Sequence, residues 1–266
     1  MSSTPEVRVA RLRPSQLAER RAQCPVVYIP LGTIEWHGLH NPLGADGLQA
    51  EEMAVRCARL GGGVVFPTVY YGESRVGSLL ETDPKYQAGV AERLGVPVEL
   101  LKEDRQPFTG MEQIRHYQHH LVHILAEAAQ YGFKLAVFVI GHYPLLDHAK
   151  SAVLTYNQWV YDKPWDKMNV WAFSDFTLLR GTIPHPGDHG GHWETSHLLA
   201  SDPETVDMSL AAPHLQYGLF TNEAPETSTA EFGDMIYDVL ARKAVTEVQK
   251  RLDNPRAYAG HGMPVD

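Results

Sequence analysis

At 266 residues the chain is long enough for one large domain, and its 44% hydrophobic and 21% charged residues are ordinary for a soluble globular protein. A net charge of −9 argues against nucleic acid or an anionic membrane as the main partner, and no apolar run is long enough for a membrane span. Only two cysteines occur, neither in a Cys-x-x-Cys pair, so a disulfide framework is not expected. A cytoplasmic location is expected instead.

Helical patterns recur along the whole chain. Long ones cover residues 46–60, 110–131, 146–161 and 228–252, and shorter pieces lie at 14–21, 85–94, 99–103 and 195–200. Residues 77–108 carry several prolines and mixed polarity. We interpret them as an excursion from the core that forms a lid or a subunit contact.

Short apolar runs typical of buried strands alternate with these helices. They cover residues 25–31, 64–66, 134–140 and 168–173. The alternation predicts an α/β fold with a mainly parallel sheet. No internal repeat or linker divides the chain, so a single domain over residues 1–266 is expected.

The first predicted strand runs into the stretch LGTIEWHGLHNPLGADG, which carries Glu35, His37, His40 and Asp46. Residues two apart on extended backbone project to the same side, so Glu35 and His37 would converge on one point. Asp46 begins the next predicted helix, where it either returns to that point or simply caps the helix. Carboxylates with an imidazole suit Zn, Mn or Fe better than Ca or Mg. The alternative is a polar loop with surface histidines.

A second strand end carries a histidine, because His142 follows the predicted strand at 134–140. Ligands of open α/β sheets lie outside the carboxyl ends of the strands, so two strand ends would present side chains to one crevice. A later loop adds further candidates, which are His185, Asp188, His189, His192 and Glu194. The four histidines at 116–123 make helix-spaced pairs without a carboxylate, so a polar helix face is expected there.

Three segments in the same order now carry a family resemblance. The first, PLGTIEWHGLHNPLGADG, has the form of a strand ending in Glu-x-His-Gly-x-His before Pro-Leu-Gly-x-Asp. The second, FVIGHY, is similar to a strand ending in Asn-Gly-His. The third, HGGHWETSHLLASDPETVDM, has the form of a His-Gly stretch before Glu-Thr-Ser. Together they resemble the creatininase family, the creatinine amidohydrolases and their relatives. The resemblance implies a three-layer α/β/α fold, hydrolase chemistry and a homo-oligomer, often a hexamer.

The resemblance also implies roles for individual residues. Glu35 and His142 would bind one metal and His37 the other, with Asp46 bridging both. The ions would be Zn and/or Mn, with Fe as an alternative, and one or two per subunit.

Glu194 falls on a glutamate at the metal centre, and His189 on the catalytic histidine. Substrate contacts are expected from His40, Arg75, Tyr143 and His185.

The chain departs from the creatinine-hydrolysing members of that family. Pro144 stands where they have a metal-binding glutamate, so either Glu194 compensates or the second metal is weak or absent. Ile140 replaces the usual asparagine before Gly-His, and Ser174 and His185 take the places of two tryptophans that close over creatinine. Creatinine is therefore not the expected substrate.

These features predict a metal-dependent hydrolase that acts on a small cyclic or amide carbonyl. Polar groups at Glu73, Arg75, His185 and Asp188, in place of lost aromatic walls, fit ring opening of a polyhydroxylated, inositol-derived cyclic ketone or of a cyclic amide. A metal-activated water would attack, with His189 as donor to the oxyanion and His189 or Glu194 as proton carrier. The alternatives are a non-catalytic, metal-stabilised binding protein and a redox Fe or Mn enzyme.

Overall fold

The computed structural model describes residues 5–73, 75, 79–160 and 167–258. Its centre is a parallel sheet in the order β2-β1-β3-β4. The strands are β1 (Val26–Leu31), β2 (Val64–Val65), β3 (Leu135–Ile140) and β4 (Asn169–Ser174). Each lies within one residue of its predicted bounds, and the predicted parallel α/β arrangement is confirmed.

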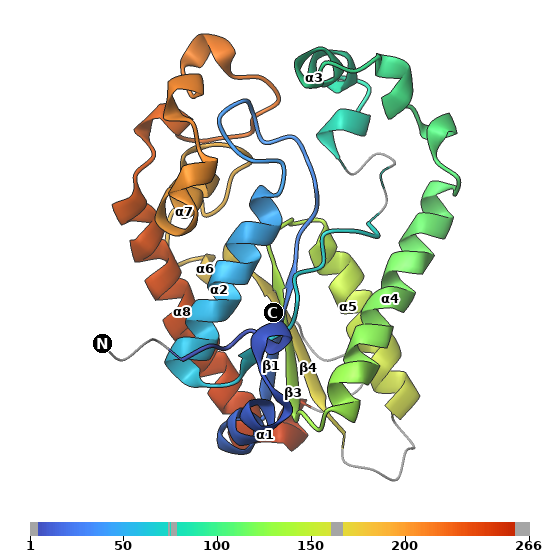
Figure 1. The fold of residues 1–266 in the computed structure, drawn as a ribbon, viewed down its shortest axis with the longest axis vertical. Coiled ribbons are helices and arrows are strands. Elements are labelled where there is room, and N and C mark those ends of the chain that lie inside the picture. Colours follow the sequence, from blue (N-terminus) through green and yellow to red (C-terminus); the bar gives the residue numbers. More distant parts are fainter. Residues whose placement is uncertain (1–4, 74, 76–78, 161–166, 259–266) are drawn as a thin grey trace.

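Helices cover both faces of this sheet (Figure 1). One face carries α2 (Ala45–Gly61) and α8 (Ala230–Asp253), and the other carries α4 (Gly110–Gln130) and α5 (Leu145–Val160). The shorter helices are α1 (Pro14–Gln23), α3 (Gln87–Leu94), α6 (Asp175–Leu179) and α7 (His192–Ser201). This is the expected three-layer α/β/α fold, and within the described ranges no helix has the length and apolarity needed to cross a membrane.

Single 3₁₀ turns make up much of the remaining chain. They are η1 (Val9–Arg11), η2 (Leu80–Thr82), η3 (Val98–Leu101), η4 (Glu103–Arg105), η5 (Pro203–Thr205), η6 (Met208–Leu210), η7 (Pro213–Leu215), η8 (Pro225–Thr227) and η9 (Pro255–Tyr258). The predicted excursion at 77–108 contains η2, α3, η3 and η4. Its buried Leu80 and Val90 pack with Trp36, so this segment covers the loop that follows β1.

The two faces of each strand belong to different cores, because successive side chains of a strand point in opposite directions. In β1, Val27 and Ile29 pack toward α4 and α5, whereas Val26 and Tyr28 pack toward α2 and α8. All four side chains are fully buried. Burial on both faces is the reason that the strands appear in the sequence as continuous apolar runs.

The strand order places a topological switch point between β1 and β3. From β1 the chain passes through α2 to β2 on one side, and from β3 it passes through α5 to β4 on the other. Leu31 pairs with Ile140, and Ile140 pairs with Ser174, so the three strands end at one level. A crevice at this position is where open α/β sheets bind ligands.

Two glycines allow the start of α2 to pack directly on these strand ends. A Cβ added to Gly32, just after β1, would overlap the backbone of Gly47, and one added to Gly141, just after β3, would overlap the carbonyl oxygen of Asp46. The first turn of α2 therefore touches the ends of both strands. This contact fixes the place of Asp46 between them.

Gly141→Ala tests this packing. The new Cβ must push against backbone rather than a movable side chain, so we expect the free energy of unfolding to fall by about 2 kcal/mol or more. Gly44→Ala is the matched control, since its Cβ would meet Tyr70 at 3.5 Å and Ile34 at 3.9 Å, both ordinary contacts, and we expect a loss below about 1 kcal/mol. Urea unfolding of both variants measures the difference, and equal losses would contradict the close approach.

Candidate metal centre

The strand ends and α7 bring five buried side chains together in two groups that share one member. Glu35, Asp46 and His142 form the first group, and His37, Asp46 and Glu194 form the second. Within each group the candidate ligand atoms all lie within 4.8 Å of one another. The structure thus places every residue that the resemblance assigned to metal binding at one centre, with Asp46 in the middle.

Asp46 occupies this position because of where α2 begins. It is the second residue of the helix, whose N-cap is Gly44 with no side-chain cap. Its Oδ1 lies 3.1 Å from His37 Nε2, and its Oδ2 lies 3.3 Å from His142 Nδ1. The alternative of a simple helix cap is therefore wrong, since the carboxylate points into the site.

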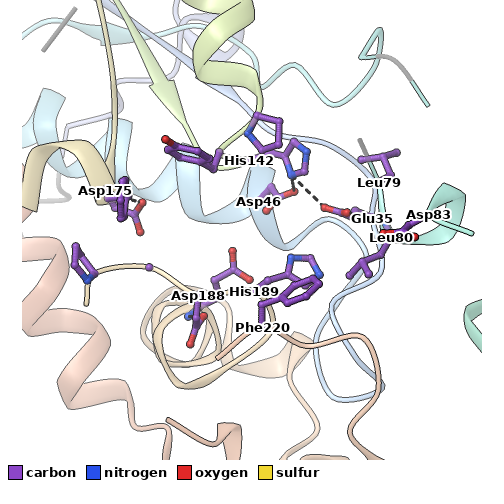
Figure 2. Close-up of a pocket in the computed structure, with 17 residues that line it drawn as sticks. Glu35, Asp46, Leu79, Leu80, Asp83, His142, Asp175, Asp188, His189 and Phe220 are labelled. Atoms are coloured by element: carbon purple, nitrogen blue, oxygen red, sulfur yellow. Dashed lines mark hydrogen bonds and ion pairs between the residues drawn. The ribbon is translucent and has the colours of Figure 1, made fainter. Parts of the chain in front are cut away.

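The first group lies on one side of a pocket, with Glu35 Oε2 at 3.1 Å from His142 Nδ1 (Figure 2). The same figure shows His189, Asp188 and Phe220 on the opposite side. Leu80 N donates to the other oxygen of Glu35 over 2.9 Å. Glu35 thus has one oxygen fixed by backbone and one directed at the centre.

The second group depends on α7. His37 Nε2 lies 3.6 Å from Glu194 Oε2, and the opposite ring nitrogen Nδ1 lies 3.0 Å from the carbonyl oxygen of Glu35. Asp188 accepts from the backbone N–H groups of Trp193 and Glu194, which fixes the first turn of α7. Glu194 therefore reaches His37 from the first turn of α7, which begins three residues before the predicted helix at 195–200.

The donor set fits divalent cations. Glu35 Oε2 and Asp46 Oδ2 are buried and accept no well-aligned hydrogen bond, although each lies close to a histidine nitrogen. Buried carboxylate oxygens without partners are rare unless an ion or water binds them. Within the described part of the chain, the pocket lining contains no lysine or arginine to neutralise them. Oxygen and imidazole ligands suit Zn and Mn.

Without metal, protons on the histidines balance these carboxylates. Burial of His37 opposes its protonation, but Asp46 and Glu194 outweigh burial and raise the pKa of His37 to about 10. The pKa of His142 is also raised well above its usual value: burial lowers it, and the close carboxylates of Asp46, Glu35 and Glu73 more than compensate. Both rings must lose a proton before they can bind a cation.

His189 lies beside the second group but, unlike His37 and His142, is not protonated at neutral pH. Its ring centroid is 4.4 Å from that of His37, and its Nε2 donates to the carbonyl oxygen of Trp36 over 2.8 Å. Burial and the neighbouring His37 lower the pKa of His189 to about 4. The ring is therefore neutral at neutral pH, and with Nε2 donating, the assigned tautomer leaves Nδ1 as a proton acceptor.

A cavity of about 480 Å³ opens onto this centre. Its walls include Tyr143, Phe176 and Phe220, and Tyr143 packs edge to face on Phe176 with ring centroids 5.3 Å apart. Asp83, Asp175 and Asp188 add carboxylates to the lining. The expectation that aromatic walls are lost is therefore wrong, because aromatic residues from other positions supply them.

The predicted substrate residues are only partly in this cavity. Tyr143 lines it, whereas His40, Arg75 and His185 do not. His40 is 2% exposed, and its Nε2 lies 3.1 Å from Thr195 Oγ1 and 3.0 Å from the carbonyl oxygen of Gly190. It supports the loop that carries His189 rather than facing a substrate.

Arg75 and His185 miss the cavity for different reasons. The guanidinium of Arg75 binds Glu81 at 2.6 Å and the carbonyl oxygen of Ile34 at 3.2 Å, so it is used in holding the excursion to the β1 loop. His185 is exposed and adopts a positive φ of 47°. Of the four polar groups expected to enrich the pocket, only Asp188 lines it.

Several pocket residues were missed in the sequence. Asp175 follows β4 directly, so the strand-end argument that identified His142 could also have found it. Burial raises its pKa to about 6, even though the N–H groups of Phe176 and Trp193 donate to it. Leu80 and Phe220 carried no signal, because contact with the centre depends on how remote loops fold back.

Proton release is the measurable consequence of the histidine pKa values. At neutral pH, metal binding should displace one proton each from His37 and His142, and a further one from Glu194 where its raised pKa, caused by burial, keeps it protonated. Apparent affinity for Mn²⁺ should then rise with pH, by about tenfold per pH unit for each proton, and level off above a pH of about 10. Calorimetry in buffers of different ionisation enthalpy counts the protons, and binding without proton release would contradict this assignment.

The chain is similar to known proteins over most of its length. The family model described as creatininase, creatinine amidohydrolase, matches residues 10–79 and 102–248. A creatinine amidohydrolase from Pseudomonas putida is 24% identical over 244 residues, which cover 82% of this chain and 86% of that protein. The family match leaves out residues 80–101, which lie within the excursion.

Solved structures show the same fold. A creatininase with Mn superposes with a TM-score of 0.69 at 20% identity, over 93% of this chain and 99% of that one. A Zn–Zn creatininase variant superposes with a TM-score of 0.69 at 19% identity, over 93% and 98%. The expected resemblance and the assignment to a family of hydrolases are confirmed: the chain belongs to the creatininase family.

Proposed function

We propose that this chain hydrolyses the carbonyl group of a small, uncharged ring compound at a centre of two divalent metal ions. The observation that carries the proposal is the sharing of Asp46 between two ligand groups, at the edge of a cavity that also contains a neutral histidine. A purely structural metal site would be closed by protein ligands, whereas this one faces open space.

Glu35, Asp46 and His142 would hold one ion, and His37, Asp46 and Glu194 the other. Glu194 supplies from α7 the carboxylate that is missing at Pro144, so the second site is complete without that position. Zn and Mn are the proposed ions, because both accept this mixture of oxygen and imidazole ligands. Metal bound here would lower the pKa of a water and polarise the substrate carbonyl.

His189 is the proposed proton carrier. Its Nε2–H is occupied by the carbonyl oxygen of Trp36, so the neutral ring would accept at Nδ1 the proton that the attacking water releases. It then returns that proton to the leaving group, which is an amine in amide hydrolysis or an enolate carbon in ring opening. Glu194 is less suited to this role, because its Oε2 accepts from Gly190 N over 2.7 Å and belongs to a ligand group.

The cavity lining limits the substrate class. Asp83, Asp175 and Asp188 lie around the centre without a lysine or arginine in the described lining, so a carboxylated or phosphorylated substrate would be repelled. Hydroxyl or N–H groups of a substrate could donate to these carboxylates, while Phe176 and Phe220 pack on a ring. A polyhydroxylated cyclic ketone or a cyclic amide fits these requirements. Creatinine is not favoured, because the two positions that carry tryptophans in creatinine-hydrolysing members offer no wall here. Ser174 is buried, and His185 lies outside the described lining.

A hydrolysis screen on metal-reconstituted protein tests the substrate class. Uncharged cyclic ketones with several hydroxyl groups, cyclic amides and formamides are compared with carboxylated analogues of the same rings. We expect turnover only in the uncharged set, measured by ring-opened product in mass spectrometry. Binding of these rings without turnover would support a binding protein instead.

Asp46→Ala tests the shared ligand. Because both groups lose a member, we expect loss of both ions by elemental analysis and a fall in activity of about 10³-fold or more. Glu52→Ala on the same helix is the control, since Glu52 pairs with Arg56 away from the centre. Full metal content in Asp46→Ala would contradict the proposed centre.

His189→Ala separates proton transfer from metal binding. Removal of a general acid–base should lower kcat by about 10²–10⁴-fold. Metal content should stay at the wild-type level, because neither proposed ion needs His189. Loss of metal together with activity would instead make His189 a ligand, as the grouping of its ring with Glu35 and His37 would also allow.

A further inference from the structure

Glu73 lies behind the metal centre, on the far side of the His142 ring from Glu35 and Asp46. Its Oε1 is 3.4 Å from His142 Nε2, while Nδ1 of the same ring faces Glu35 and Asp46. The Glu73 side chain is 3% exposed. The ring of His142 is therefore held between two sets of carboxylates, of which only one was assigned a role.

The atoms between Glu73 and His142 have no other partner in the described residues. Both carboxylate oxygens of Glu73 and Nε2 of His142 are buried without a well-aligned hydrogen bond. A buried carboxylate without partners is costly, so its persistence needs a reason. The 3.4 Å between Glu73 Oε1 and His142 Nε2 is an ion-pair distance, just longer than the usual range of N–H···O hydrogen bonds.

Nearby groups do not offer Glu73 a better partner. Arg75, two residues along the chain, directs its guanidinium to Glu81 and Ile34. The charge of Glu73 also acts on Tyr117 and His148, whose rings pack edge to face at 5.5 Å. Within the described residues neither ring makes a hydrogen bond to Glu73, whereas His142 Nε2 lies 3.4 Å from its Oε1.

The backbone is shaped to deliver this side chain. Gly72 has a φ of 105°, a conformation that residues with a side chain rarely adopt, and a Cβ there would lie 3.0 Å from the ring of Tyr117. The turn before Glu73 therefore lies flat on α4. From this position the chain directs Glu73 inward, to the buried side of His142.

A carboxylate on the outer nitrogen decides which nitrogen of a histidine can bind metal. When Nε2 carries the hydrogen and donates it to Glu73, Nδ1 keeps a lone pair aimed at Glu35 and Asp46. Such outer carboxylates fix both the tautomer and the orientation of a ligand ring. Glu73 itself is in none of the candidate ligand groups of the described residues, so it would act through His142.

We propose that Glu73 is a positioning residue that accepts the Nε2–H of His142 and thereby orients this ring toward the ion shared with Glu35 and Asp46. This inference rests on the proposed metal centre and adds an outer residue to it. It also explains why a glutamate is buried beside a site that already contains many carboxylates.

The test compares Glu73→Ala with Glu73→Gln by titrating metal-free protein with Co²⁺ and with Mn²⁺ against a chelator. Removal of the acceptor in Glu73→Ala should weaken one of the two ions by about 10–100-fold. The amide oxygen of Glu73→Gln still accepts the bond, so its affinity should stay within about fivefold of wild type. Tyr117→Phe, which removes a neighbouring polar atom but not the contact, should bind as wild type.

Cobalt absorption gives a readout that a merely structural role would not change. In Glu73→Ala the ligand-field bands of the weakened ion should shift, while circular dichroism and the unfolding midpoint report whether the fold is intact. Wild-type affinity and bands in Glu73→Ala would overturn the proposal. Equal losses in Glu73→Ala and Glu73→Gln would also overturn it, because charge rather than hydrogen bonding would then be responsible.

Failure of the metal centre itself looks different. If wild type bound neither Co²⁺ nor Mn²⁺, or if Asp46→Ala bound both normally, the proposed centre would be wrong. If wild type binds two ions that require Asp46 and Glu73→Ala does not differ from it, only the role of Glu73 fails.

Discussion

The carboxylate of Asp46, buried between His37 and His142, is the contact on which the arrangement of this centre depends. Its two oxygens face two different histidines, which come from the ends of two neighbouring strands. This is achieved only because the first turn of α2 packs on those strand ends without intervening side chains at Gly32 and Gly141. The close backbone packing at the switch point therefore determines where the carboxylate of Asp46 lies in the site.

A second set of contacts joins the excursion to this centre. Leu80 N donates to Glu35, and Glu81 accepts from Trp36 N and from Arg75. The carbonyl oxygen of Trp36 in turn accepts from His189. The loop after β1 is thus held from one side by the excursion and from the other by the loop before α7, so the excursion forms a wall of the site and belongs to it structurally.

Charge explains why these features occur together. Within the described lining, histidines are the only side chains that can carry a positive charge beside six carboxylates. The acids are Glu35, Asp46, Asp83, Asp175, Asp188 and Glu194. Such a density of buried negative charge is unfavourable unless cations or protons neutralise it. Metal ions at the two ligand groups would neutralise part of this negative charge. A substrate rich in hydrogen-bond donors would bind the remaining carboxylates of the cavity.

The sequence by itself determined the sheet and much of the centre, because these depend on local patterns. Apolar runs between helical patterns predicted the strands. The positions of Glu35, His37 and His142 after the ends of strands predicted that they lie at the same edge of the sheet. Asp46 and Glu194 were found through motif order, although the sequence left open whether Asp46 only caps its helix.

Only the tertiary structure decided the rest, because it depends on contacts between segments far apart in the chain. Phe176 and Phe220 supply aromatic walls from positions that no motif marks, and Glu194 reaches His37 although 157 positions separate them in the sequence. Long-range packing also removed His40 and Arg75 from the substrate pocket, since each found a buried partner elsewhere. Periodicity and strand-end position act over a few residues, whereas the shape of the cavity is set by how segments from six parts of the chain meet, at 35–46, 79–83, 141–144, 175–176, 186–194 and 220.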